Sequence, residues 1–231
     1  MGSEKRAQRP RAGTAERRRR ILQAALVTFG SKGYSNGPLT EIAEQVGMTH
    51  AGILHHFGSK DQLLIEVLKY RDEADLQDLH EQRVPTGIEL FRHLVRTAFA
   101  NEERPGIVQA YAVLSAESVT DGHPGRAHFG QRYTGLRRDI VDAFHVVCAE
   151  RGIDVPETVD RAAASIAAVM DGLQVQWLLD RGSVELARAS AFAIETLVSA
   201  VAGPEAAAQV HEAVPDKGGP DKGVPTPDRQ G

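Results

Sequence analysis

The sequence is poor in three features, and each absence narrows the class of protein. A single cysteine, Cys148, stands among 231 residues, so no internal disulfide can form, which suits a reducing cytoplasm. No apolar run approaches the roughly 20 residues that a membrane-spanning helix needs, so we expect no membrane partner. Runs of β-branched residues are short and alanine is abundant, which favours helix. We expect an all-α protein located in the cytoplasm.

Motifs of the common enzyme and metal classes are also missing. The sequence contains no G-x-S-x-G, no phosphate-binding glycine loop and no H-E-x-x-H. His145 and Cys148 could place two metal ligands on one helical face, but no second pair lies near, which favours a packed helix. Glu102 and Glu103 have no partner base. We expect no cofactor, no metal and no catalysis, with an all-α enzyme as the alternative.

The most informative stretch is residues 39–57, which read L-T-E-I-A-E-Q-V-G-M-T-H-A-G-I-L-H-H-F. The pattern predicts two short helices joined at Gly47, because glycine tolerates the left-handed backbone that ends a helix. Thr40 and Thr49 each precede a helical segment, where a hydroxyl can cap backbone N–H groups. This is the pattern of a helix-turn-helix, whose second helix enters the major groove of DNA. The alternative is an ordinary helical hairpin in a core.

The second predicted helix has two unlike faces. Ile53 and Phe57 are four residues apart and would hold this helix against the first. Small residues on the opposite face would let the helix backbone approach base edges. That face carries His50, Ala51, Gly52 and His55, with Leu54 at its edge.

Basic residues flank this motif. The first twenty residues contain eight basic and two acidic residues, although the whole chain has a net charge of −4. A basic end on an acidic chain fits attachment to phosphate; a solvated charge run is the alternative. After the motif, residues 59–62 predict a capping box that opens a new helix. Lys60 in its first turn would add a charge beside N–H groups that suit a phosphate, unless it is an ordinary surface lysine. The basic residues before the motif are Lys5, Arg6, Arg9, Arg11, Arg17, Arg18, Arg19 and Arg20.

Order, spacing and residue type over about residues 17–64 match one protein family. The matching residues are Ile21, Ala24, Ala25, Phe29, Gly33, Tyr34, Thr40, Ile42, Ala43, Val46, Gly47, Thr49, Ile53, His55, His56, Phe57, Lys60, Leu63 and Leu64. In these residues the chain resembles the TetR family of bacterial transcriptional regulators. The resemblance implies a homodimeric all-α repressor with an N-terminal DNA-binding domain and a C-terminal domain for ligand binding and dimerisation. It also implies a small-molecule ligand that moves the two DNA-binding heads apart.

The resemblance further implies roles for single residues. Thr40 and Lys60 match phosphate contacts, and His55 and His56 match a pair that lies near phosphate or packs beneath the helix. Leu54 stands where the family usually has a tyrosine that reaches a phosphate. Leucine cannot donate that bond, and contact with a thymine methyl group would be its substitute. The positions that face bases and the nearby backbone are Thr49, His50, Ala51 and Gly52, of which Gly52 replaces a commoner threonine.

The rest of the chain predicts a plan of four parts. We expect a disordered basic arm, a DNA-binding domain with its helix-turn-helix at about 38–57, a ligand-binding and dimerisation domain, and a mostly disordered tail rich in proline and glycine. These parts are residues 1–13, 14–62, 63–203 and 204–231. Helices of the second domain are predicted at about 59–83, 86–101, from 105 onward, 126–150, 156–180 and 183–201.

Two sets of residues in the second domain are candidates for binding. A cavity with aromatic walls and a few polar groups suits a small, mainly apolar molecule, with plain core or surface as the alternative for each residue. Its candidates are Phe91, Tyr111, Glu117, Phe129, Tyr133, Met170, Gln174 and Trp177. Alanine-rich faces on the last two helices suit a four-helix bundle between subunits, with one subunit's own core as the alternative. These dimer candidates are Val159, Ala163, Ile166, Met170, Leu186, Ala193 and Leu197.

Together these features predict a sequence-specific DNA-binding transcriptional regulator. It would be a homodimer that binds double-stranded operator DNA as a repressor and leaves it when a small-molecule effector binds. A transcriptional activator would share every motif. A ligand-binding helical dimer without DNA binding is a further alternative.

Overall fold

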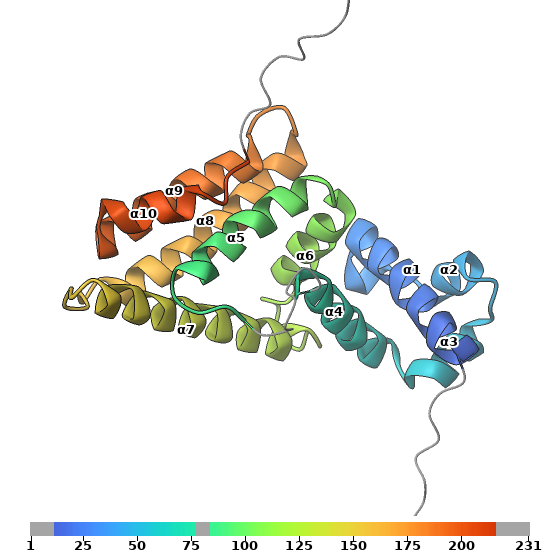
Figure 1. The fold of residues 1–231 in the computed structure, drawn as a ribbon. Coiled ribbons are helices and arrows are strands. Elements are labelled where there is room, and N and C mark those ends of the chain that lie inside the picture. The colour runs from blue at the N-terminus through green and yellow to red at the C-terminus, as the bar shows by residue number, and fades with distance from the viewer. Residues whose placement is uncertain (1–11, 77–83, 216–231) are drawn as a thin grey trace, which may run out of the picture.

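The computed structural model describes residues 12–76 and 84–215, which form helices joined by short turns (Figure 1). The described residues contain no strand, which confirms the all-α prediction. The helices are α1 (Ala12–Asn36), α2 (Leu39–Gln45), α3 (His50–Phe57), α4 (Lys60–Leu76), α5 (Ile88–Glu102), α6 (Pro105–Glu117), α7 (Arg126–Glu150), α8 (Val159–Leu179), α9 (Leu186–Ala202) and α10 (Pro204–His211).

Helices α1 to α4 form a small head at one end of the molecule (Figure 1). Apolar residues of α1, α2, α3 and the first half of α4 share one core. This core continues into α6 and α7 through Ala110, Tyr111, Leu114 and Phe129. The head is therefore packed directly against the larger helical body, with α6 at the junction.

The turn between α2 and α3 follows the predicted pattern in most respects. Gly47 has φ of +68°, and the Thr49 hydroxyl accepts a hydrogen bond of 3.1 Å from the Gly52 N–H. The prediction that Thr40 caps α2 was wrong. Pro38 occupies the cap position with no side-chain hydrogen bond, because α2 begins one residue before Thr40.

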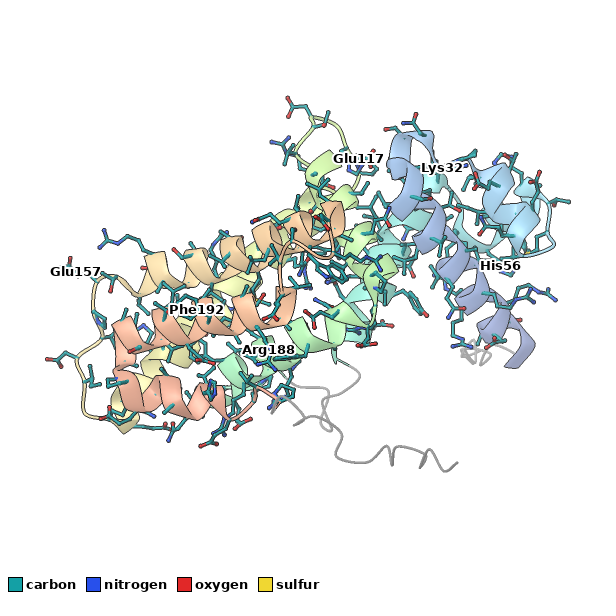
Figure 2. The ribbon with its side chains drawn as sticks, turned by 90° about the horizontal axis from the view of Figure 1, so that it is seen from above. Lys32, His56, Glu117, Glu157, Arg188 and Phe192 are labelled. Atoms are coloured by element: carbon teal, nitrogen blue, oxygen red, sulfur yellow. The ribbon has the colours of Figure 1, made fainter. Side chains whose placement is uncertain are left out.

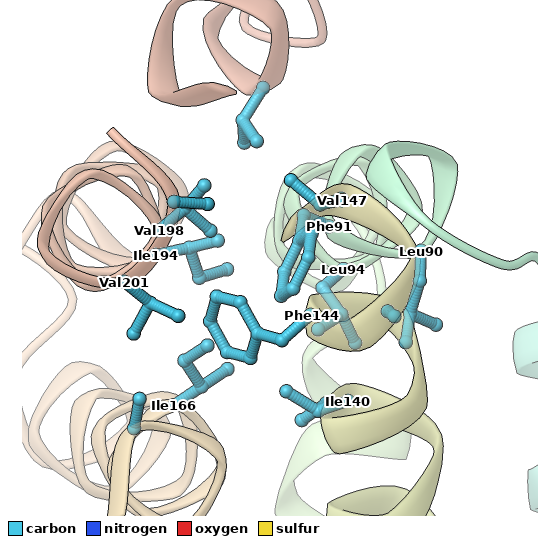
Figure 3. Packing of buried hydrophobic residues seen from close by; sticks show 14 of the residues in the cluster. Leu90, Phe91, Leu94, Ile140, Phe144, Val147, Ile166, Ile194, Val198 and Val201 are labelled. Atoms are coloured by element: carbon cyan, nitrogen blue, oxygen red, sulfur yellow. The ribbon is translucent and has the colours of Figure 1, made fainter. Parts of the chain in front are cut away.

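Helices α5 and α7 to α10 enclose a second core (Figure 3). The Phe91 and Phe144 rings lie 4.7 Å apart at its centre, and Ile166 and Ile194 pack there from α8 and α9. This close packing gives the body a rigid frame, which is the support that a binding cavity needs.

Most predicted helices are present, with shifts at their ends. Residues 126–150 were predicted as a helix and form α7. The first residues of the segment predicted as a mostly disordered tail form α10, in which Ala206 and Val210 are buried against the body. The basic arm lies outside the described residues except for its last two positions, and so do the end of the helix predicted at 59–83 and the tail beyond 215.

One described helix, α8, is long and apolar enough to cross a membrane by length and composition, with a mean hydropathy of 1.3. From the absence of a long apolar run, the sequence predicted no such helix. Alanine and valine nevertheless raise the mean hydropathy of α8 without forming one continuous apolar run. In the structure, Ala163, Ile166 and Met170 of α8 are buried in the body's core. The apolarity of α8 is thus explained in large part by packing within the protein.

Candidate DNA-binding surface and ligand cavity

The outer face of α3 is open. Thr49, His50, Ala51 and His55 are exposed, and Thr40 is exposed at the start of α2. Gly52, Leu54 and His56 are partly exposed. Nothing in the described part of the chain covers the small-residue side of this helix, so it is free to approach a duplex.

The inner face of α3 anchors it in the head. Ile53 is fully buried and Phe57 is 5% exposed, and both belong to the head's core. Gly58 ends the helix with φ of +82°. Burial, followed by the positive charges of His55, Arg17 and Arg18, lowers the pKa of His56. Near neutral pH this favours an uncharged His56, which weakens its case as a phosphate contact.

Arg18 turns inward and clamps the end of α3. Its guanidinium donates 3.1 Å to the His56 carbonyl and forms a 2.5 Å ion pair with Glu66 of α4. The same group lies 4.3 Å from the centre of the Phe57 ring. Arg18 therefore joins α1, α3 and α4, whereas Arg17 beside it is exposed.

Lys60 also makes contacts within the head. Its Nζ donates 3.3 Å to the Ser35 carbonyl and lies 4.7 Å from the centre of the Tyr34 ring. Burial lowers the pKa of Lys60, and the charges of Glu117 and Asp61 oppose this shift. The ammonium thus lies at the surface between α1 and α4 but is held by neighbouring groups.

A cavity of about 410 Å³ lies in the body between α4, α5, α6, α7 and α8. Leu90, Leu94, Leu136 and Met170 form an apolar part of its wall. The polar lining residues are Arg71, Asp72, His93, Thr97, Asn101, Tyr111, His128, Gln131, Arg132, Asp139, Asp171 and Gln174. Its volume is in the range that suits a small organic ligand.

One wall of the cavity is a network of charges around Asp72. Arg132 and Arg71 approach its carboxylate at 2.9 and 3.2 Å, and His128 Nε2 lies 3.1 Å away. Arg71 also stacks on Tyr111, with its guanidinium carbon 4.2 Å from the ring centre. Burial alone would raise the pKa of Asp72, but the close contact with His128 and the arginine charges outweigh it, so the pKa is lowered. Asp72 is thereby held as a carboxylate.

A second acid, Asp171, lies on α8 in a different environment. The Tyr133 hydroxyl donates a hydrogen bond to it. Burial raises the pKa of Asp171 despite that bond and the charges of Arg132 and Arg71. The two acids of the cavity are therefore shifted in opposite directions.

The cavity contains only part of the predicted ligand set. Tyr111, Met170 and Gln174 line it, while Tyr133 reaches a lining residue through its hydrogen bond to Asp171. Phe129 lies behind Tyr111, with ring centres 5.5 Å apart. Phe91 lies in the body's core instead, and Trp177 packs in a separate cluster with Val108 and Leu186.

Glu117 belongs to the junction between head and body rather than to the cavity. Its Oε2 accepts a 2.7 Å hydrogen bond from the Tyr34 N–H, at the end of α1 (Figure 2). Gly33 has φ of +76°, and an added Cβ there would lie 2.1 Å from Glu117 Oε1. A Cβ on Gly30 would likewise lie 2.9 Å from the Ala110 Cβ. Gly30 therefore lets α1 lie this close to α6, and Gly33 is favoured by its positive φ at the end of α1.

Most of the predicted dimer residues fill the core of a single subunit. Each is 8% exposed or less, because four of them lie in the core that α8 shares with α5 and α7 and Leu186 packs against Val108 of α6 and Trp177. They are Val159, Ala163, Ile166, Met170 and Leu186. Ala193 and Leu197 are partly exposed. The five buried side chains therefore face the interior of their own subunit.

The outer faces of α8 and α9 carry another apolar set. Phe192 is 73% exposed (Figure 2), and Val175 and Leu179 are 46% and 83% exposed. Exposed alanines extend the set at positions 164, 168 and 200. Residues four apart lie on one helical face, so each helix has a continuous outer stripe of small and apolar groups.

The cavity's charged wall was missed by the sequence analysis. A signal existed for Arg71, which follows Val67 and Leu68 at three- and four-residue spacing and so lies on the buried stripe of α4. Nothing local indicates that Arg132 and His128 of α7 meet Asp72 of α4. That pairing depends on how the two helices pack.

Comparison with known proteins matches both halves of the chain. Residues 21–67 match the bacterial regulatory proteins of the tetR family. Residues 87–202 match the C-terminal domain of the BetI-type transcriptional repressors. The transcriptional regulator BetI of Agrobacterium fabrum is 28% identical over 184 residues, which cover 76% of this chain and 83% of that protein.

Solved structures share the fold over most of the chain. TylP, a TetR regulator from Streptomyces fradiae, has a TM-score of 0.64 at 23% identity, covering 84% of this chain and 90% of that one. The transcriptional regulator FadR from Bacillus subtilis, solved in complex with stearoyl-CoA, has a TM-score of 0.65 at 18% identity and covers 79% and 98%.

Proposed function

This chain belongs to the TetR family of bacterial regulatory proteins and has the C-terminal domain of a BetI-type transcriptional repressor, and on that basis we propose how it binds and leaves DNA. It is a DNA-binding, ligand-responsive transcriptional repressor rather than an enzyme. In our proposal it acts in the cytoplasm as a homodimer. Two copies of α3 enter successive major grooves of a near-palindromic operator.

The observation that carries this proposal is the open small-residue face of α3. His50 and Ala51 project from a helix that Thr49 caps and that Ile53 anchors. We assign base reading to His50, Ala51 and Gly52, with Leu54 and His55 at the edges of the contact. Phosphate contacts come from Thr40, Thr49, Lys60 and the exposed arginines of α1, with His56 packed beneath α3. Base contacts supply specificity and phosphate contacts supply most of the affinity.

The cavity is the effector site in this proposal, and α4 and α6 couple it to the head. Helix α4 has Arg71 and Asp72 at the cavity and Lys60 at the head. Helix α6 has Tyr111 at the cavity, Ala110 against α1 and Glu117 bonded to Tyr34. A ligand that favours one placement of these helices shifts the spacing of the heads by no more than its preference for that state.

The outer faces of α8 and α9 form the dimer interface in this proposal. Phe192, Val175 and Leu179 are large apolar side chains that water would otherwise contact. Alanines beside them permit close helix approach, so two helices from each subunit form a four-helix bundle. A two-fold operator requires a two-fold protein, which ties this surface to DNA recognition.

The test begins with selection of bound fragments from random DNA, followed by affinity measurements on the selected fragment over a range of salt concentrations. Ala51→Glu adds a charge to the exposed face of α3 and is expected to abolish specific binding without changing the melting temperature. Lys60→Ala is expected to weaken binding to all sequences and to reduce the salt slope by about 1. Lys32→Ala, an exposed lysine paired with Glu41 at 2.5 Å, is the control. Full specific binding by the Ala51→Glu protein would contradict the assignment of α3.

A further inference from the structure

Gln174 is a buried polar side chain in the wall of the cavity. It is 6% exposed and lines the cavity, and its Oε1 is buried with no hydrogen-bond partner in the described part of the chain. A buried amide that lacks a partner destabilises the folded state, and native proteins rarely keep such a group without a use. Its position in the cavity wall indicates that a bound molecule supplies the missing donor.

Asp171 presents a second acceptor one helical turn earlier. Residues 171 and 174 are three apart, so both lie on the side of α8 that faces the cavity. Arg71, Arg132 and His128, which also line the cavity, lie 2.9 to 3.2 Å from Asp72. Asp171 has the Tyr133 hydroxyl as its donor and no described Lys, Arg or His within ion-pair distance. The α8 side of the cavity therefore offers two acceptors, Gln174 Oε1 and the Asp171 carboxylate.

Leucines of α5 and α7 supply an apolar part of the cavity wall. Leu90 and Leu94 of α5 are 2% and 7% exposed, and Leu136 of α7 packs beside them. A molecule that fills about 410 Å³ must contact both this wall and α8. The occupant thus needs an apolar body and a polar end.

We propose that the effector is a small amphipathic amine or alcohol, whose N–H or O–H group donates to Gln174 and Asp171 while its apolar part packs on the leucines. The proposal rests on the function proposed above, in which this cavity receives the effector. The raised pKa of Asp171, caused by burial, agrees with a carboxylate that gains from one more donor. A carboxylate group at the α8 side of the cavity would place like charge beside Asp171 and leave Gln174 Oε1 without a partner.

Four probes with one apolar chain separate the contributions. Hexylamine, protonated at neutral pH, and hexanol both donate hydrogen bonds, hexyltrimethylammonium has charge without a donor, and hexanoate has the opposite charge. In calorimetric titrations of the full chain, we expect hexylamine and hexanol to bind at least tenfold more tightly than the other two. Hexanoate or hexyltrimethylammonium binding as tightly as hexanol would overturn the proposal, and so would the absence of binding by both donors.

Gln174→Met provides a readout that needs no ligand, because methionine has a similar volume and adapts its shape. Removal of the unpartnered amide is expected to raise the melting temperature of the free protein by about 2–8 °C. The same change should weaken hexanol binding at least tenfold. Gln176→Met, on the exposed side of the same helix, is the matched control and should change neither quantity. A fall in melting temperature for Gln174→Met would show that the amide is already satisfied and would overturn the proposal.

Release of a selected DNA fragment separates this inference from the proposed function. Probes that bind with the expected preference but leave DNA affinity unchanged would refute the cavity's role in regulation and support the ligand class. Equal binding of all four probes would refute the ligand class without affecting DNA recognition.

Discussion

Replacing Arg18 with methionine tests whether this arginine positions the recognition helix or contacts phosphate. The change keeps the apolar stem and removes three interactions of the guanidinium: the 3.1 Å bond to the His56 carbonyl, the stacking on Phe57 and the ion pair with Glu66. A hydrogen bond from a charged donor contributes about 1.5–3 kcal/mol, and a cation over an aromatic ring contributes about 0.5–1 kcal/mol at an exposed site. The ion pair contributes about 0–1 kcal/mol because the arginine side chain is 38% exposed.

These terms share one group and do not add fully, so we expect the free energy of unfolding to fall by about 2–3 kcal/mol. Loss of the clamp should lower affinity for the selected DNA about tenfold or more, since the end of α3 is no longer held to α1 and α4. The salt slope should not change, because the guanidinium is engaged inside the head. Arg17→Met is the matched control: its side chain is exposed, so we expect a salt slope reduced by about 1 and unchanged stability.

The assays are chemical denaturation and fluorescence anisotropy on one DNA fragment at four or five salt concentrations. Equal reductions in salt slope for the Arg18 and Arg17 variants would refute the positioning role. A fully stable Arg18→Met protein would refute the energetic argument.

Three further predictions concern the interface, the junction and the cavity. Phe192→Glu should convert the dimer to a monomer in analytical ultracentrifugation, whereas Val119→Glu, at a site 76% exposed elsewhere, should remain dimeric; a dimeric Phe192→Glu protein would exclude this face. Gly33→Ala should lower the free energy of unfolding by about 1–3 kcal/mol, because alanine is strained at φ of +76° and its Cβ displaces Glu117. Adding Glu117→Ala removes the displaced side chain but leaves the backbone strain, so the double variant should regain only part of the lost stability. Full recovery of stability in denaturation experiments would contradict the backbone strain. Asp72→Asn should cost about 3 kcal/mol at pH 7, because it leaves Arg71 and Arg132 without that carboxylate. The folded-state pKa of Asp72 is lowered, so this stabilisation is complete above the unfolded value of about 3.9 and is lost as the pH falls toward the folded pKa; a difference from wild type that stays constant below pH 4 would contradict the pairing.

The head could be predicted closely because its signals are local. Gly47 and Thr49 act on backbone within three residues of themselves, and Ile53 and Phe57 define a buried stripe by spacing alone. Thr40 failed as a cap because α2 begins at Leu39, one residue before it. Arg18 was read only as a positive charge, and its inward direction depends on Glu66, 48 residues later.

The body could be predicted as helices but not as surfaces. Helices α8 and α9 are apolar on more than one side, so periodicity did not distinguish the face toward α5 from the outer face, which we propose as the dimer interface. Phe192 was therefore overlooked while Ile166, which is 1% exposed, was selected. The cavity is lined by residues from five helices. Which helices pack together around it is not indicated by the sequence pattern of any single segment.

The seam between Gly33 and Glu117 limits how hybrid sensors can be engineered from this protein. A foreign head with any larger residue at position 33 would collide with the carboxylate that receives the Tyr34 N–H. A foreign body without that carboxylate would leave the Tyr34 N–H without its hydrogen-bond acceptor. A hybrid in which the head is joined to a foreign body should therefore include α6 with the head, so that Gly33, Tyr34 and Glu117 all come from the same protein.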